Sequence, residues 1–267
     1  MKKKISIIIT LFRTPLKKIK NLNQYRNFNT LVFEQEQNNE SIVHIKKILK
    51  FKFKYYGSNK NIGLGKASNF LFDKVKNKYC LFTQPDVKIK HASIIRLKKI
   101  LEKHKKAICI SPTNFKKKKS KSYEVKEKID FSCIMIDVKK MKKIGFFDED
   151  YFLYWEDIDL INRIKQSEYC MLQANNVNFE HHSSSSSEDT DEIAMIRNKN
   201  YIYGEFLYDY KNNKLRIYKI LRKIFQNIFL FFFNILIFRI KHSKIYVAKL
   251  LGINKFIFFY LRKNFTK

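Results

Sequence analysis

The sequence predicts an α/β fold, in which a mostly parallel sheet is flanked by helices and followed by a helical tail. Three observations lead to this prediction. Apolar strand patterns alternate with helical patterns over the first two thirds of the chain, which is typical of a parallel sheet covered on both faces. A chain of 267 residues with 45% hydrophobic residues can bury a large core. From about Asp189, strand patterns give way to aromatic and basic helical patterns.

The first half of the chain supplies the alternating elements. Ile5–Phe12 is a short apolar run and predicts a buried strand. It does not predict a signal peptide, because Arg13 interrupts it and no small-residue cleavage site follows. The next patterns predict strands over residues 29–34, 51–56, 79–83 and 107–111, and helices over 41–50, 64–76 and 92–104.

The middle of the chain continues this alternation after a polar interruption. Residues 114–128 have few apolar side chains and include four consecutive lysines at 116–119, so we expect an exposed loop between two halves. Residues 131–137 predict another buried strand. Val138–Ile144 predicts a short helix that Gly145 ends.

The tail has a different character. Aromatic side chains follow helical spacing between residues 197 and 210, and residues 244–262 repeat the basic and aromatic pattern. Residues 224–238 are nearly all apolar but fall short of the roughly 20 residues that span a bilayer. Four polar residues form one narrow helical stripe there: Lys223, Asn227, Asn234 and Lys241. This stripe favours a helix that lies in a membrane interface, or docks on another apolar surface, over a spanning helix.

The net charge of +31 narrows the classes of partner. Lys greatly outnumbers Arg, and the basic residues are spread along the chain. A nucleic-acid-binding protein relies on Arg to bind phosphate and bases, so we expect no nucleic acid partner. An anionic membrane surface or an anionic lipid-linked substrate explains the charge equally well.

The four cysteines carry no motif. They are far apart, each lies in or beside an apolar run, and no pair has CxxC spacing. The sequence therefore gives no support for a zinc or redox site. We expect buried, reduced thiols in a cytosolic protein.

Acidic residues gather between Gly145 and Arg163, although the chain is otherwise basic. A helix is predicted to begin near Glu156, because isoleucines at 158, 161 and 164 repeat at helical spacing. Carboxylates in a first turn stabilise a helix N-terminus, which is one explanation for Glu156 and Asp157. Catalysis is the other explanation.

Polar segments also follow the predicted strands, at the sheet edge where ligands bind in folds of this class. Residues 34–41 form a polar segment in which Ser41 can cap a helix. Residues 59–69 hold Gly63 and Gly65 before a helix, which suits either a phosphate or a plain turn. Gln84-Pro85-Asp86 suits either a cation or a Pro-Asp turn.

A fourth polar segment ends a later strand pattern. It reads Val-Asn-Phe-Glu-His-His over residues 177–182, and five serines follow it. A histidine here is either a metal ligand or a surface residue. The serines are either a loop that closes over a substrate or a plain linker.

The order of these segments resembles the family 2 glycosyltransferases, enzymes of GT-A fold that build bacterial cell-surface polysaccharides and include rhamnosyltransferase-like members. The acidic stretch is similar to the family's GFDE…ED.DL..R segment, and residues 59–69 are similar to N.G.G.A.N. Gln84-Pro85-Asp86 stands where the family carries D.D or NPD. The resemblance runs from Ile5 to about His182.

This resemblance implies a GT-A-like, Rossmann-type sheet and a division of the chain. Residues 1–188 would form the catalytic domain, with a nucleotide-sugar half over about 1–112 and an acceptor half over about 113–188. Residues 189–267 lie beyond the resemblance, and their basic and aromatic composition predicts a helical tail that attaches to a membrane surface or packs on the catalytic domain. The expected location is cytoplasmic, at the periphery of the inner membrane, as in lipopolysaccharide synthesis.

The resemblance also implies inverting, metal-dependent transfer of a hexose or deoxyhexose from a nucleotide sugar to a glycan or lipid-linked acceptor. Asp157 would be the general base that takes the proton of the acceptor hydroxyl. Mg²⁺ or Mn²⁺ would be held by Asp86 and His181, with His182 as the alternative ligand. The implied donor-binding residues are Thr10, Glu36 (or Glu34), Asn61, Gly63, Gly65, Lys66, Asn69 and Gln84. The implied acceptor-binding residues are Asp148, Trp155 and Glu156.

The chain departs from the family pattern at two positions. Gln84 replaces the first acid of D.D, and the usual DN.S element is missing near Glu36. These departures leave a second function open, a catalytically weak GT-A-like scaffold in a polysaccharide assembly complex. The basic charge leaves a nucleic-acid-binding protein as the last alternative, and the set of motifs argues against it.

Overall fold

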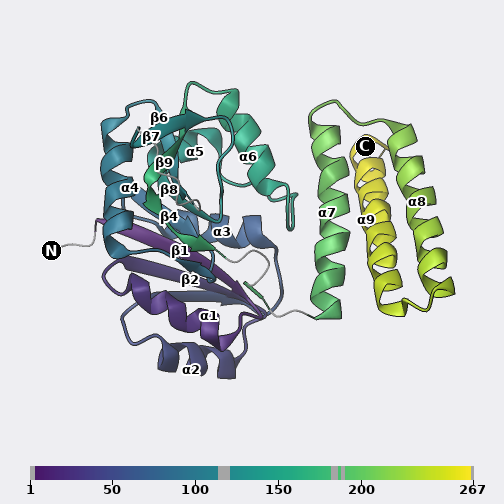
Figure 1. Cartoon of the computed structure of the whole chain (residues 1–267), viewed down its shortest axis with the longest axis horizontal. Coiled ribbons are helices and arrows are strands. Elements are labelled where there is room, and N and C mark those ends of the chain that lie inside the picture. The colour runs from purple at the N-terminus through teal and green to yellow at the C-terminus, as the bar shows by residue number, and fades with distance from the viewer. Residues whose placement is uncertain (1–3, 114–120, 182–185, 188–189, 266–267) are drawn as a thin grey trace. The chain divides into compact units, whose positions relative to one another are not determined.

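A computed structural model describes residues 4–113, 121–181, 186–187 and 190–265 (Figure 1). The lysine run at 116–119 and the alternative ligand His182 lie outside these residues. The chain forms two units. The first contains residues 1–148 and 160–188, and the second contains residues 149–159 and 189–267.

The first unit is built on an eight-stranded sheet that is mainly parallel. The strands are β1 (Ile5–Phe12), β2 (Asn29–Gln35), β3 (Lys54–Ser58), β4 (Tyr79–Thr83), β6 (Ala107–Thr113), β7 (Tyr123–Lys126), β8 (Cys133–Asp137) and β9 (Cys170–Asn178). Within the described residues their order is β3-β2-β1-β4-β8-β6-β9-β7. The β1–β4 strands are parallel and β6 is parallel to β9, whereas β8 runs antiparallel to both of its neighbours. The predicted α/β class is confirmed.

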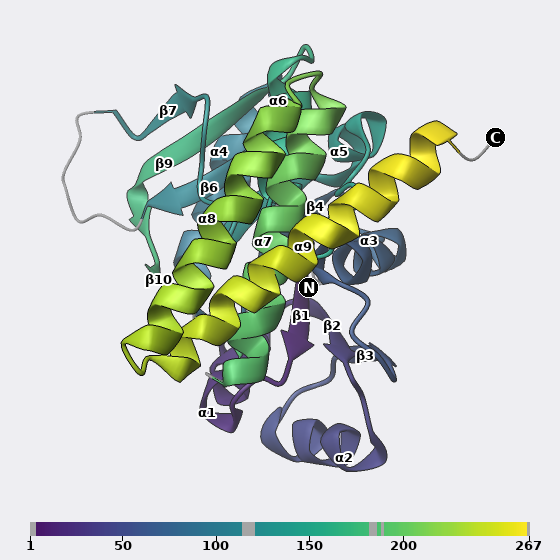
Figure 2. The same ribbon diagram turned by 90° about the vertical axis from the view of Figure 1, so that its right-hand side faces the viewer.

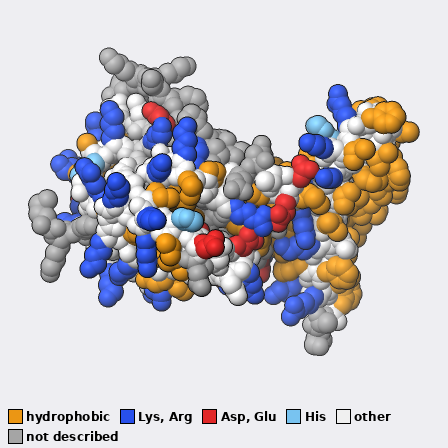
Figure 3. Space-filling model, turned by 90° about the horizontal axis from the view of Figure 1, so that it is seen from below, with side chains coloured by type: hydrophobic (Ala, Val, Ile, Leu, Met, Phe, Trp, Pro, Cys, Tyr) orange, Lys and Arg blue, Asp and Glu red, His pale blue; other side chains and the backbone are white. Residues whose placement is uncertain are grey.

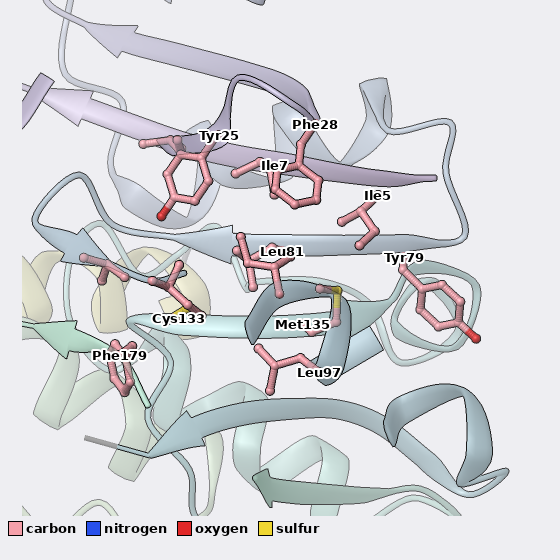
Figure 4. Packing of buried hydrophobic residues seen from close by; sticks show 14 of the residues in the cluster. Ile5, Ile7, Tyr25, Phe28, Tyr79, Leu81, Leu97, Cys133, Met135 and Phe179 are labelled. Atoms are coloured by element: carbon pink, nitrogen blue, oxygen red, sulfur yellow. The ribbon is translucent and has the colours of Figure 1, made fainter. Parts of the chain in front are cut away.

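Helices cover both faces of this sheet. They are α1 (Leu16–Asn21), the 3-10 helix η1 (Leu22–Tyr25), α2 (Asn39–Ile48), α3 (Leu64–Lys74), α4 (His91–Lys103), α5 (Val138–Ile144) and α6 (Glu156–Lys165). One buried cluster takes side chains from α1, α2 and α4, and the other from α3, α5 and α6. Figure 4 shows part of the first cluster, where Ile5, Ile7 and Leu81 pack together. Because both faces are covered, every side chain from Ile5 to Ile9 is buried, which explains the unbroken apolar run.

Two expectations need correction. Part of the loop expected over 114–128 is a strand, since β7 pairs antiparallel with β9. This strand lies at the edge of the sheet and leaves Val125 59% exposed, so it needs few apolar side chains. The N-cap of α2 is Asn38, and Ser41 completes a capping box as its third helical residue.

The second unit contains the helices α7 (Asp191–Lys211), α8 (Ile217–Leu236) and α9 (Ile240–Phe265). The last helix packs against the other two, and Figure 2 shows it crossing α7. A Cβ atom at Gly252 would lie 2.2 Å from the carbonyl oxygen of Lys199, so only glycine permits this approach of α9 to α7. Lys219 of α8 pairs with Glu205 and Asp209 of α7. None of the described helices is both long enough and apolar enough to cross a membrane.

All four cysteines are free thiols, and all lie in the strands of the first unit. Cys80, Cys109 and Cys133 are completely buried, whereas Cys170 is partly exposed. Burial raises the pKa of each of the three buried thiols far above its usual value. These thiols therefore stay protonated and unreactive in the folded chain.

Candidate functional site

Four polar side chains converge beyond the carboxyl end of β4. Nε2 of His181 lies 3.6 Å from Oδ2 of Asp86 and 3.2 Å from Oε1 of Gln84. The hydroxyl of Ser186 donates a 2.8 Å hydrogen bond to Oδ1 of Asp86 and lies 3.4 Å from Oε1 of Gln84. We call these four residues the Asp86 cluster.

A tight turn and a short strand pair assemble this cluster. After β4 ends at Thr83, the amide N–H of Val87 donates to the carbonyl of Gln84 and closes a turn that contains Asp86. The next two residues form β5 (Val87–Lys88), which pairs antiparallel with β10 (Glu180–His181). His181 stands opposite Val87 in this pairing, so its ring comes to Asp86 although the two are distant in sequence.

The Asp86 cluster offers ligands that suit a divalent cation. Asp86 is 1% exposed, and a carboxylate buried to this extent needs a compensating charge or hydrogen bonds. A carboxylate, an imidazole, an amide oxygen and a hydroxyl are all ligands for such ions. Within the described parts of the chain, no group of three or more His, Cys, Asp or Glu side chains could hold a metal. A cation here would therefore have two strong protein ligands and need other oxygens, as Mg²⁺ sites that use substrate phosphates do.

The segment before α3 is organised by an amide side chain that the sequence did not single out. Oε1 of Gln35, at the end of β2, accepts hydrogen bonds from the amides of Ile62 and Gly63 at 2.9 and 3.0 Å. Oδ1 of Asn61 accepts from the same Gly63 amide at 3.0 Å. Gly63 has φ 91°, a conformation that favours glycine, and it is the N-cap residue directly before α3. Gly63 is therefore required by the conformation of this turn.

The two candidate acids after β2 have separate partners. The carboxylate of Glu34 accepts hydrogen bonds from the hydroxyls of Tyr55 and Ser41. Burial, together with this bond to Glu34, raises the pKa of Tyr55. Oε2 of Glu36 lies 2.8 Å from Nε of Arg13. Both residues of this ion pair have a positive φ angle, 56° at Glu36 and 43° at Arg13. Residues other than glycine rarely adopt such angles, and those that do are often found at functional sites.

The remaining predicted donor residues differ in their surroundings. Thr10 is half-buried and lies two residues before the end of β1. Lys66 is exposed in the first turn of α3, and Gly65 is buried in the same turn. Both ends of the Asn69 amide bind the backbone of Phe147, at 3.0 and 2.8 Å, so Asn69 fixes that loop. A role for these four residues in donor binding stays a prediction.

A guanidinium group binds the residues just before this loop position. Arg163 of α6 donates to the carbonyl oxygens of Ile144, Gly145 and Phe146 at 3.1, 2.8 and 2.7 Å. The arginine of the acidic motif is therefore a clamp on the residues that open the motif. Asp148 lies half-exposed at the end of the loop.

The acidic residues themselves begin α6 in a strained setting. Tyr154 and Trp155 both have left-handed backbone conformations, with φ 67° and 72°. Each costs of the order of 1 kcal/mol, and such strain tends to occur at functional sites. Oδ1 of Asp157 accepts a 2.8 Å hydrogen bond from the amide of Ile158, as expected for a first-turn carboxylate. The helix-stabilising explanation of this residue therefore holds, and it does not exclude catalysis.

Glu156 is a buried acid in this turn. It is 5% exposed, and its Oε2 has no hydrogen-bond partner among the described residues. Burial, and next the charge of Asp157, raise the pKa of Glu156 to about 8. Glu156 is therefore largely protonated near neutral pH.

Trp155 packs within the second unit. Its ring lies 5.8 Å from that of Tyr201 and 5.4 Å from that of Tyr208, both on α7. A Cβ atom at Gly204 would lie 2.7 Å from Cδ1 of the indole, so the helix has a glycine where the ring sits. Trp155 thus anchors its segment to α7, and contact with an acceptor sugar stays a prediction.

The architecture of the chain is that of GT-A-type glycosyltransferases. No protein-family model and no curated protein sequence matches the chain, and the likeness appears in solved structures. A mannosyltransferase from Pyrobaculum calidifontis, in complex with GDP-Man and Mn²⁺, matches all of this chain (100%) and 77% of its own, with TM-score 0.58 and 11% identity. GalNAc-T7 with UDP, GalNAc and Mn²⁺ matches 76% of this chain, with TM-score 0.55 and 13% identity.

A third similar structure is S. aureus TarS. Its residues 1–349 match 99% of this chain and 93% of their own length, with TM-score 0.51 and 12% identity. The chain spans 38% of a longer TarS structure and 47% of GalNAc-T7. At these identities the likeness establishes the fold, whereas activity and substrates are matters for a proposal.

Proposed function

We propose that the protein is an inverting glycosyltransferase, which moves a hexose or deoxyhexose from a nucleotide sugar to a glycan or lipid-linked acceptor in cell-surface polysaccharide synthesis. One observation carries the proposal. On a GT-A-type sheet, the turn after β4 and the strand pair β5–β10 bring Asp86 and His181 together at the edge where ligands bind in α/β folds. The rhamnosyltransferase-like subtype is part of the same proposal.

The Asp86 cluster would hold Mg²⁺ or Mn²⁺. Asp86 and His181 are the proposed protein ligands, with oxygens of Gln84 and Ser186 beside them. A bound cation would neutralise the charge that develops on the departing diphosphate. His181 must be neutral, with an unprotonated Nε2, to act as a ligand, so a bound cation would replace the 3.2 Å contact between this nitrogen and Oε1 of Gln84. The Mn²⁺ in two of the similar structures supports this choice of cofactor.

Donor binding would involve the residues at the ends of β1 and β2 and the start of α3. Glu36 remains the preferred acid for the nucleoside, because Arg13 holds it in a fixed position. Glu34 is already bound by Tyr55 and Ser41. Lys66 is exposed and can reach a phosphate.

Asp157 is the proposed general base. It would take the proton of the acceptor hydroxyl as that oxygen attacks the anomeric carbon. Glu156 is the neighbouring acid, and because it is largely protonated it adds little negative charge beside the base. Asp148, Trp155 and Glu156 remain the proposed acceptor-side residues.

The test is a screen of sugar nucleotides for hydrolysis or transfer, with Mg²⁺, Mn²⁺ or a chelator. We expect metal-dependent turnover of one donor, and a loss of at least about 100-fold in Asp157→Asn with donor binding retained. Asp150→Asn is the matched control, because Asp150 lies in the same acidic stretch and pairs with Lys211 on the surface. A protein that binds no donor with either cation would refute the proposal.

The scaffold function is the second candidate, and one observation favours it. Gln84 supplies an amide where the family usually has an acid, so the Asp86 cluster has a single carboxylate. This candidate predicts that the protein binds a donor but transfers its sugar to no acceptor. It also predicts that Asp157→Asn leaves donor binding unchanged.

We propose a cytoplasmic location, on the inner face of the inner membrane. A lipid-linked acceptor would be presented there, and the basic composition suits an anionic leaflet.

A further inference from the structure

Helix α8 buries polar side chains and exposes apolar ones, the opposite of a helix that faces water. Asn227 and Asn234 are buried, at 4% and 7% exposure, and their amides bond to carbonyl oxygens of their own helix. Phe225 and Phe229 are 70% and 67% exposed. A helix on a water-soluble surface buries its phenylalanines and exposes its asparagines. The outer side of α8 is therefore built for contact with something apolar.

This apolar side is continuous. Positions 225, 229, 232 and 236 follow the spacing of a single helix face, and they lie on the side opposite the two buried asparagines. The turn into α9 extends the face, since Phe238 is 89% and Ile240 is 64% exposed. Figure 3 shows hydrophobic side chains gathered over this part of the helical unit. Single exposed apolar residues are ordinary, whereas a continuous face of this kind marks a binding surface.

The charges around this face indicate its partner. Residues 224–238 carry no charge, and exposed basic residues lie at both ends: Arg216, Arg222, Arg239 and Lys241. From Asn212 to Phe265 the sequence has no Asp or Glu at all. Basic side chains that border an apolar helix face bind the phosphates of anionic lipids while the apolar groups enter the acyl region. A second copy of this chain would bring a further +31, which opposes self-association.

We propose that the outer face of α8 and the α8–α9 turn insert into the interface of an anionic bilayer, with α8 lying parallel to the membrane plane. At 1.5 Å per residue its 20 residues give a contact about 30 Å long. The inner side of α8 contains the buried Asn227 and Asn234 and is held to α7 by the ion pairs of Lys219 and Lys223 with Glu205, so one side alone is available to lipid. This inference deepens the location given under the proposed function, and it can be tested without donor, acceptor or metal.

The first experiment is sedimentation of the full chain with vesicles of phosphatidylcholine alone or with phosphatidylglycerol added. We expect binding to the anionic vesicles, and a loss of about tenfold or more in Phe229→Ser/Phe232→Ser. Val43→Ser/Val125→Ser is the matched control, because these side chains are 58% and 59% exposed on the sheet unit and should not matter. Arg239→Gln/Lys241→Gln should weaken binding to the vesicles that contain phosphatidylglycerol and leave binding to pure phosphatidylcholine unchanged.

The second experiment does not depend on a loss of binding. In Phe232→Trp we expect a blue shift of emission, and quenching by bromine-labelled lipid, that the unsubstituted protein with its single Trp155 does not show. Absence of vesicle binding and of quenching in the folded protein would overturn the proposal. Light scattering that shows a dimer, lost in Phe229→Ser/Phe232→Ser, would overturn it in favour of a second copy. Sugar transfer without vesicle binding would overturn this inference while leaving the proposed function in place.

Discussion

The buried acid at the start of α6 makes the stability of the chain depend on pH. The pKa of Glu156 is raised from 4.5 to about 8 in the folded chain, so the folded state keeps a proton that the unfolded state releases. Unfolding is therefore increasingly favoured as pH rises through this window. Each pH unit corresponds to about 1.4 kcal/mol, which sets an upper limit of about 4 to 5 kcal/mol across the whole window. Below pH 4.5, the ordinary pKa of this carboxyl, both states are protonated and the destabilisation disappears.

Glu156→Gln removes this titration with little change of shape. We expect the substituted protein to match the original near pH 4.5 and to exceed it increasingly toward pH 8, by about 2 to 4 kcal/mol at the upper end. Urea unfolding followed by circular dichroism at several pH values measures the difference. Glu149→Gln is the control, because Glu149 is an exposed acid in the same segment. A constant difference over the whole range, or one that shrinks as pH rises, would refute a buried, protonated Glu156.

Three further outcomes follow from the contacts described above. Asp86→Asn and His181→Ala should each weaken Mn²⁺ binding by about tenfold or more in calorimetry, whereas Asp73→Asn, at an exposed acid of α3, should not. Gly252→Ala should destabilise the chain by about 2 kcal/mol or more in urea, because its Cβ would meet a carbonyl oxygen at 2.2 Å, and an unchanged midpoint would contradict that packing. Arg163→Lys should cost about 1 to 3 kcal/mol, since one ammonium group cannot replace three bonds to carbonyl oxygens, and Lys165→Arg in the same helix should cost little.

Local patterns predicted most of the sheet and its helices. The strand at Ile5–Phe12, the strand at Tyr79–Thr83 and the helix at Val138–Ile144 have the bounds that the periodicity indicated. The reason is physical, because a strand buried on both faces leaves an unbroken apolar run and a glycine ends a helix. The edge strand β7 escaped prediction because pairing through its backbone makes few demands on its side chains.

The family resemblance placed Asp86 and His181 at one metal ion, whereas local sequence patterns did not show how the two residues meet. Asp86 and His181 were both expected as ligands, but the two-residue strands that join them have no periodicity to detect. The pairing of Arg13 with Glu36, and the left-handed backbone at Trp155, depend on tertiary contacts that outweigh local preference. The glycines at 63 and 65 indicated a turn, but nothing in the local pattern showed that Gln35, the last residue of β2, organises it.

The positions of the cysteines make it possible to measure by thiol labelling which part of the chain unfolds. Cys80, Cys109 and Cys133 sit in β4, β6 and β8, neighbouring strands of the sheet, and the helical unit has no thiol. An alkylating reagent can modify these three only when the strands separate, so the rate of their labelling counts excursions of the sheet alone. Partial labelling that leaves α7 to α9 intact by circular dichroism would reveal whether the two units come apart together or one at a time.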